Sequence, residues 1–126
     1  MEYLFIEAPV FMKRRDALFA GDDDFRDFQM QLAGNPGAGD VIPGCAPLRK
    51  TRWQSRKRGQ GKRGGRRIIY LWIPEIRWIF LILAYGKGER DDLSPTDKKR
   101  LREMARQLRR ESLAIHGGTK YGKAQG

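Results

Sequence analysis

The sequence predicts a single α+β domain, in which a small antiparallel sheet follows two helices and precedes a third. Two observations predict this class. The two most strand-like runs, rich in Ile, Tyr and Trp, follow one another near the middle of the chain. Helical spacing of apolar residues occurs before and after these runs. Helices and strands that are grouped along the chain, rather than alternating, are typical of α+β folds. A length of 126 residues suits one domain.

The N-terminal part is predicted to hold a short strand and two helices. The strand is YLFIE, and the first helix begins at Pro9, because proline is tolerated at the first helical position. Gly21 ends that helix, and Asp22–Asp24 begins the next, since acids favour the positive end of the helix dipole. The second helix ends at Gly34–Pro36. The apolar positions at helical spacing are Val10, Phe11, Leu18 and Phe19, then Phe25, Phe28 and Leu32.

The middle of the chain is predicted to supply most of the sheet. Residues 35–47 are rich in turn formers, and residues 48–53 alternate as a strand does. Residues 67–73 and 77–85 are predicted strands, joined by a turn at Pro74–Ile76. Because these two strands are almost continuously apolar, we expect both of their faces to be covered.

The same apolar hairpin is the only membrane candidate in the sequence. Pro74, Glu75 and Arg77 interrupt it, and the longest uninterrupted piece, residues 78–85, is too short to span a bilayer. The N-terminus does not resemble a signal peptide. Cys45 is the single cysteine, which excludes a disulfide framework and a multi-cysteine metal site. We therefore expect no membrane association, no bound metal or cofactor, and a reducing cytoplasmic environment.

A last helix is predicted to begin at Ser94–Asp97, where serine caps, proline takes the first helical position and an acid the third. One apolar face is expected to include Leu101, Met104, Ala105 and Leu108 and to extend to Ile115. The cations of residues 98–110 are interpreted as a solvated face, with contact to ribosomal RNA as the alternative. Gly117 is expected to end the helix. Residues 1–116 then form the domain, and residues 117–126 a flexible tail.

Cationic side chains dominate the composition and gather in one stretch. Lys and Arg number 26 against 15 Asp and Glu, a net charge of +11, which points to a nucleic acid, an anionic membrane or an acidic protein as partner. Nine cations and no acid lie between Lys50 and Arg67. Strand alternation predicts that Lys50 and Arg52 share a face, to which a neighbouring strand can add Arg67. Such a surface suits a phosphate backbone and, if concave, a phosphoryl transition state.

Four segments carry a resemblance to a known family: NPGAGDVIPG, LRKTR, GKRGGRRIIYLW and LAYGKGERDDLS, in this order and spacing. Together they resemble the RelE/ParE toxin superfamily, in particular HigB-like RelE-type toxins of bacterial type II toxin–antitoxin systems. The resemblance implies a microbial-RNase-like fold and a ribosome-dependent mRNA endonuclease, or mRNA interferase. Such a hydrolase cleaves mRNA in the A site of the 30S subunit and inhibits translation. It implies metal-independent attack by the ribose 2′-oxygen. The implied partner is a cognate antitoxin, usually a helix-turn-helix protein encoded adjacently.

The resemblance also implies the roles of individual residues. Lys50 and Arg52 match the paired basic positions of the central strand, Arg67 matches the cation that opens the following strand, and Lys87 matches the lysine of the GK.E turn, which comes one strand later. We expect Arg67 and Lys87 to clamp phosphate, and Lys50 or Arg52 to contact phosphate and the 2′-OH. The base stays open between a lysine of the cluster and Glu89.

The remaining cations of this region are candidate RNA contacts, together with one aromatic residue. They are Arg49, Trp53, Arg56, Lys57, Arg58, Lys62, Arg63, Arg66 and Arg90. Trp53 is suited to stacking on a base, and packing in the core is the equal alternative. Two other functions stay open: a non-catalytic RNA- or ribosome-binding protein, and a ParE-like gyrase inhibitor. The density of cations favours RNA.

Overall fold

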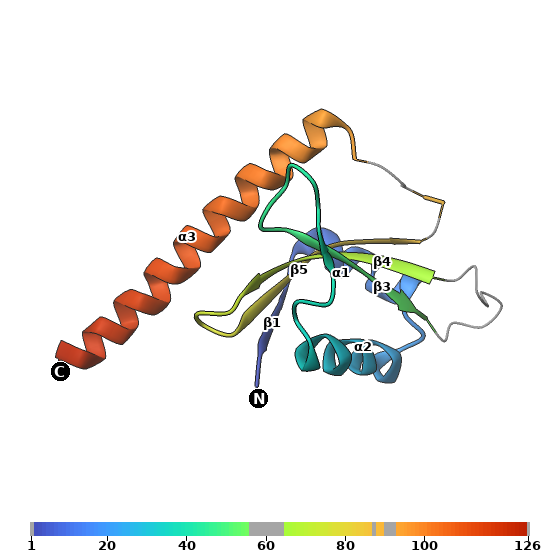
Figure 1. The fold of residues 1–126 in the computed structure, drawn as a ribbon. Coiled ribbons are helices and arrows are strands. Elements are labelled where there is room, and N and C mark those ends of the chain that lie inside the picture. Colours follow the sequence, from blue (N-terminus) through green and yellow to red (C-terminus); the bar gives the residue numbers. More distant parts are fainter. Residues whose placement is uncertain (1, 56–64, 87, 90–92, 126) are drawn as a thin grey trace.

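A computed structural model describes residues 2–55, 65–86, 88–89 and 93–125, with side chains as far as His116. The described residues form one five-stranded sheet and three helices (Figure 1). The strands are β1 (Leu4–Glu7), β2 (Asp40–Val41), β3 (Arg49–Gln54), β4 (Gly65–Ile73) and β5 (Trp78–Gly86). The helices are α1 (Pro9–Leu18), α2 (Asp22–Gly34) and α3 (Pro95–Gln125). The predicted α+β class and the placement of the three helices are confirmed.

The sheet has the strand order β1-β5-β4-β3-β2. The pairs β2–β3, β3–β4 and β4–β5 are antiparallel, as predicted, whereas β1 pairs parallel to β5 and makes the sheet mixed. The short strand β2 falls within the turn-rich residues 35–47, where the sequence predicts irregular structure. The turn Pro74–Arg77 joins β4 to β5. None of the helices in the described part of the chain combines the length and the apolar character that crossing a bilayer requires.

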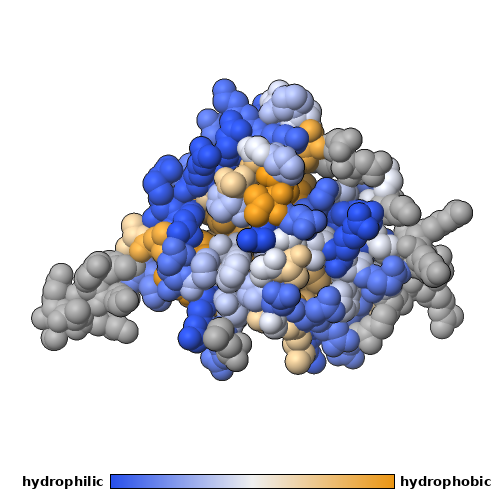
Figure 2. All heavy atoms as spheres, in the orientation of Figure 1, coloured by the Kyte–Doolittle hydropathy of each residue, from blue (hydrophilic) through white to orange (hydrophobic). Residues whose placement is uncertain are grey.

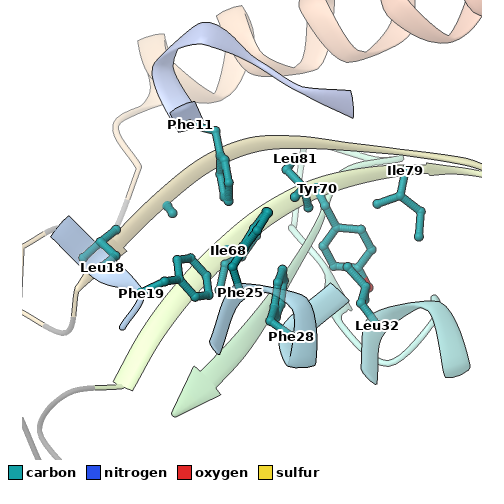
Figure 3. Close-up of a cluster of buried hydrophobic side chains, with 11 residues drawn as sticks. Phe11, Leu18, Phe19, Phe25, Phe28, Leu32, Ile68, Tyr70, Ile79 and Leu81 are labelled. Carbon is teal, nitrogen blue, oxygen red and sulfur yellow. The ribbon is translucent and has the colours of Figure 1, made fainter. Parts of the chain in front are cut away.

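Helices pack on both faces of the sheet, and two separate clusters of buried side chains result. Ile68 and Tyr70 of β4 join residues of α1 and α2 in the first cluster (Figure 3). Ile69 and Leu71, which alternate with them, join Ala105 of α3 in the second cluster. Figure 1 shows α2 and α3 on opposite sides of the sheet. The expectation that both faces of the apolar hairpin are covered is therefore confirmed, and it explains the continuous apolar runs.

The predicted helix starts are confirmed, and one predicted helix end is wrong. Pro9 opens α1, and α2 begins directly after Gly21, whose φ of 103° is a conformation that favours glycine. The backbone N–H of Asp97 donates to Ser94 Oγ at 3.0 Å, which caps α3. However, α3 continues through Gly117 to Gln125. A glycine inside a helix costs only about 1 kcal/mol relative to alanine, so it does not by itself end a helix.

We predict that Phe28→Ala lowers the free energy of unfolding by about 3–5 kcal/mol, because it removes a buried ring from the first cluster. Phe28 is only 2% exposed and its ring lies 5.7 Å from that of Trp53. Met30 lies on α2 as Phe28 does, but it is 67% exposed and therefore provides the control. Met30→Ala is expected to change stability by less than about 0.5 kcal/mol. Urea denaturation measures both, and equal effects would contradict the burial of Phe28.

Candidate functional site

The strand register brings three of the predicted site residues together. Arg52 of β3 lies directly opposite Arg67 of β4, and Lys50 lies opposite Ile69. Residues directly opposite one another project from the same face of an antiparallel pair. Since Ile69 belongs to the cluster beneath α3, Lys50, Arg52 and Arg67 all project from the α3 face. We call these three residues the cationic row. Their predicted convergence on one face is confirmed.

No ion pair neutralises the charges of the cationic row within the part of the chain that the structure describes. No side-chain hydrogen bond or ion pair of Lys50, Arg52 or Arg67 is formed with any of the residues that the structure describes. Arg52 is exposed, and the other two are partly buried. The Cβ atoms of directly opposite residues such as Arg52 and Arg67 lie about 5 Å apart. Two like charges that approach to about 4 Å repel by about 1 kcal/mol in water, and by more where water is excluded. A bound anion would relieve this repulsion.

A groove adjoins the cationic row along the β2–β3 edge. It has a volume of about 270 Å³ and is lined by Ala38, Gly39, Asp40, Lys50, Thr51 and Arg52. Asp40 lies directly opposite Lys50 in the β2–β3 register and therefore projects from the same face. Its position beside the row is not predicted from the sequence. Asp40 is the last residue of the NPGAGD segment, and nothing in that segment indicates a strand paired with β3.

The wall of the groove is held by contacts from the opposite face of the sheet. Tyr70 Oη donates to the Pro36 carbonyl oxygen at 2.6 Å and accepts the backbone N–H of Gly39 at 3.0 Å. Arg49 Nη1 donates to the carbonyl oxygens of Gly39 at 2.7 Å and Gly37 at 3.3 Å. Burial raises the pKa of Tyr70, so the phenol stays a neutral donor. Arg49, which the sequence predicts as an RNA contact, helps to fix this loop.

Asp24 is a second structural centre that the sequence does not reveal. Its side chain is 1% exposed and accepts three hydrogen bonds, from the Ala20 N–H at 2.8 Å, Trp53 Nε1 at 3.0 Å and Ser55 Oγ at 2.9 Å. The indole of Trp53 also packs edge-on against Phe28. These contacts favour the packing alternative for Trp53 over stacking on a base. Asp24 therefore ties the end of β3 to the start of α2.

Arg66 and Arg67 are neighbours in sequence and lie on opposite faces of β4. Arg66 is 4% exposed, and its Nε donates to the Leu18 carbonyl oxygen at 2.8 Å. Burial lowers the pKa of Arg66, and the nearby carboxylates of Glu89 and Asp24 oppose that shift. A guanidinium enclosed in this way offers little surface to RNA, so its surroundings favour a structural role for Arg66 over the predicted RNA contact. The period of two along a strand gives the two arginines different environments.

Glu89 lies away from the cationic row. Its Oε1 accepts the Gly86 N–H at 2.5 Å, and both carboxylate oxygens lie 2.7 Å from Arg14 Nη2. Gly86 is opposite Arg66, and a Cβ at Gly86 would lie near both Glu89 and Arg66, which places Glu89 on the α1 face. The Gly86 hydrogen bond and the Arg14 charge lower the pKa of Glu89. A carboxylate that is paired and weakly basic is a poor general base, so these contacts favour a structural role for Glu89 over the predicted role as the base.

Several predicted residues lie outside the described part of the chain. These are Lys87 and the candidate RNA contacts Arg56, Lys57, Arg58, Lys62, Arg63 and Arg90. Within the described residues, no group of three or more His, Cys, Asp or Glu side chains is arranged to hold a metal ion. The chain matches no model of a known protein family.

We predict that Glu89→Gln lowers stability at neutral pH and has little effect in acid. The pKa of Glu89 is lowered in the folded state, so its contribution is fully present above the unfolded value of about 4.3 and is lost as the pH falls through the folded value. The gap in unfolding free energy between wild type and variant should be about 1 kcal/mol or less, as for a half-exposed ion pair. Urea denaturation at a series of pH values between about 7 and 3 measures whether the gap closes. Exposed Glu103, changed to Gln, is the control, and a gap that widens in acid would contradict the assignment.

Proposed function

We propose that this protein is a metal-independent endoribonuclease toxin of a type II toxin–antitoxin system, which cleaves mRNA in the ribosomal A site. The observation that carries the proposal is the cationic row. Lys50, Arg52 and Arg67 project from one face of two paired strands and have no anionic partner among the described residues. Unpaired cations that a rigid sheet holds together are complementary to a phosphodiester. The resemblance of the four sequence segments to RelE-type toxins agrees with this.

The cationic row suits the charge changes of RNA cleavage. When the ribose 2′-oxygen attacks the adjacent phosphorus, a negative charge builds up on the pentavalent phosphorane. Arg52 and Arg67 offer planar guanidinium groups, which donate in pairs to phosphate oxygens. Lys50 adds a point charge next to them. Since these donors are part of the sheet, they need little reorganisation during the reaction. The requirement for a 2′-OH would make DNA inert as a substrate.

The proposed partners follow from the charge of the whole chain. A net charge of +11 favours association with the ribosome and mRNA through salt-dependent contacts to phosphate. Figure 2 shows hydrophilic residues along the N-terminal part of α3. We propose that the protein acts in the cytoplasm. A cognate antitoxin, encoded next to the toxin, would hold it inactive. A helix-turn-helix protein is the expected type of antitoxin.

A non-catalytic RNA-binding protein is the second candidate. The observation that favours it is the position of Glu89, since the acid predicted as a base is paired with Arg14 on the other face of the sheet. A cationic surface without a general base binds the phosphate backbone without cleaving it. The two candidates make different predictions for translated mRNA, because only the endonuclease leaves cuts within codons.

We predict that Arg67→Ala lowers the rate of mRNA cleavage on programmed ribosomes by about 100-fold or more, because it removes a donor to the transition-state charge. Lys50→Ala is expected to act in the same direction. Lys13 is an exposed cation on α1, and Lys13→Ala should cleave at the wild-type rate. Sequencing of mRNA ends and growth arrest on induction measure the effect. Wild-type protein that binds ribosomes and leaves mRNA intact would support the second candidate, and toxicity unchanged in both site variants would remove the cationic row from the mechanism.

A further inference from the structure

The structure places an acid beside the cationic row, and we propose that this acid, Asp40, is the general base that deprotonates the ribose 2′-OH. The inference rests on the proposed endoribonuclease function and assigns the base that the mechanism needs. Asp40 lies directly opposite Lys50 in the β2–β3 register. The two side chains therefore leave the sheet on the same face. Glu89, the acid predicted for this role, lies on the other face.

The groove beside the cationic row brings Asp40 close to the two other groups that the reaction needs. Asp40, Lys50 and Arg52 all line it. Directly opposite residues have Cβ atoms about 5 Å apart, and diagonal ones about 7 to 8 Å. Asp40 is opposite Lys50 and diagonal to Arg52 by register. Because Asp40 shares this groove with Lys50 and Arg52, its carboxylate can reach the 2′-OH of a ribose whose phosphate the two cations hold.

The carboxylate of Asp40 is available for this role. Asp40 is exposed, and it forms no side-chain hydrogen bond or ion pair with the residues that the structure describes. The nearest cation by register, Lys50, is also without an ion pair in the described part of the chain. Glu89 differs on this point, because its two oxygens are occupied by Arg14 and Gly86. Asp40 and Lys50 are opposite each other by register and yet form no ion pair. This is not what is expected of an acid whose role is to neutralise the neighbouring cation.

The backbone that carries Asp40 is held in place. The preceding residue, Gly39, is buried, with its N–H bonded to Tyr70 Oη and its carbonyl oxygen bonded to Arg49. A Cβ at Gly39 would lie 2.8 Å from Tyr70 Oη and 2.9 Å from the Lys50 carbonyl oxygen. Only glycine allows the loop to approach β3 and β4 so closely. General base catalysis needs such fixed placement, since the base must stay within hydrogen-bond reach of the proton that it removes.

The proposed step balances without a co-reactant other than water. Asp40 takes the proton of the 2′-OH, and the 2′-oxygen forms a bond to the adjacent phosphorus. The bond between phosphorus and the 5′-oxygen breaks, and that oxygen takes a proton from solvent. The products are a 2′,3′-cyclic phosphate and a 5′-hydroxyl. Asp40 then returns its proton to solvent, and nothing is oxidised or reduced.

The test separates chemistry from binding by using two versions of one mRNA on programmed ribosomes. The first is all-RNA and is cleaved, and the second has a 2′-deoxyribose at the cleaved position and reports affinity alone. We expect Asp40→Asn to lower the single-turnover cleavage rate by about 100-fold or more, as for loss of a general base. Its affinity for the deoxy-substituted mRNA should be unchanged or tighter, because a negative charge next to phosphate is removed. Glu103→Gln on α3 is the charge-matched control and should behave as wild type.

The other outcomes are distinct. If wild type cleaves and Asp40→Asn cleaves at a similar rate, the inference is overturned and the proposed function stands. If the variant loses affinity while its rate at saturation is retained, Asp40 is a binding residue and the inference is also overturned. If wild type cleaves no mRNA on ribosomes, the proposed function fails together with the inference. Thermal unfolding of Asp40→Asn should match wild type, since the side chain is exposed, and Asp40→Glu should retain part of the cleavage rate.

Discussion

Arg52 and Arg67 lie directly opposite each other in β3 and β4, and like charges in this position repel. The pairing persists because the buried residues that follow Arg67 determine the register. Ile69 and Leu71 are fully buried under α3, while Ile68 and Tyr70 are fully buried under α1 and α2. A slip by one residue would move each of these side chains into the cluster on the opposite face, where it would not match the shape of its new neighbours. The hydrophobic core therefore holds two cations together that would otherwise separate, and the cationic row depends on this constraint.

Charge is treated differently on the two faces of the sheet. On the α1 and α2 face, Arg14 pairs with Glu89, and Arg66 donates to a backbone carbonyl near Asp24. These groups connect the ends of β3, β4 and β5 to the N-terminal helices. On the α3 face, the cationic row has no such partners among the described residues. Buried polar groups need partners to offset the loss of water, whereas partly exposed cations retain water until a ligand replaces it. The difference between the faces is what distinguishes a scaffold from a candidate site.

Periodicity predicts which residues share a face, and this is why the cationic row could be identified from the sequence. Lys50 and Arg52 are two residues apart in a strand. The apolar run that follows Arg67 predicts that the next strand begins at Arg67. The partners of Glu89 and Asp24 could not be predicted in this way, because they depend on contacts distant in sequence. Arg14 and Glu89 are 75 residues apart, and Asp24 and Ser55 are 31 apart. The position of Asp40 beside the row could be seen only from the β2–β3 pairing, since the turn-rich sequence before Asp40 gives no strand signal.

The position of Asp40 bears on the choice between binding and chemistry. A surface that only holds a phosphate backbone gains affinity from every cation and loses it with every nearby acid. Asp40 is directly opposite Lys50, at the edge of the row where it opposes binding of a polyanion. The fold holds it there through Gly39, Tyr70 and Arg49 rather than leaving it on a mobile tip. An acid that the sheet holds beside unpaired cations weakens phosphate binding. Deprotonation of a 2′-OH next to a bound phosphate, however, requires such an acid. For this reason we prefer the proposed endonuclease to the proposed RNA-binding protein.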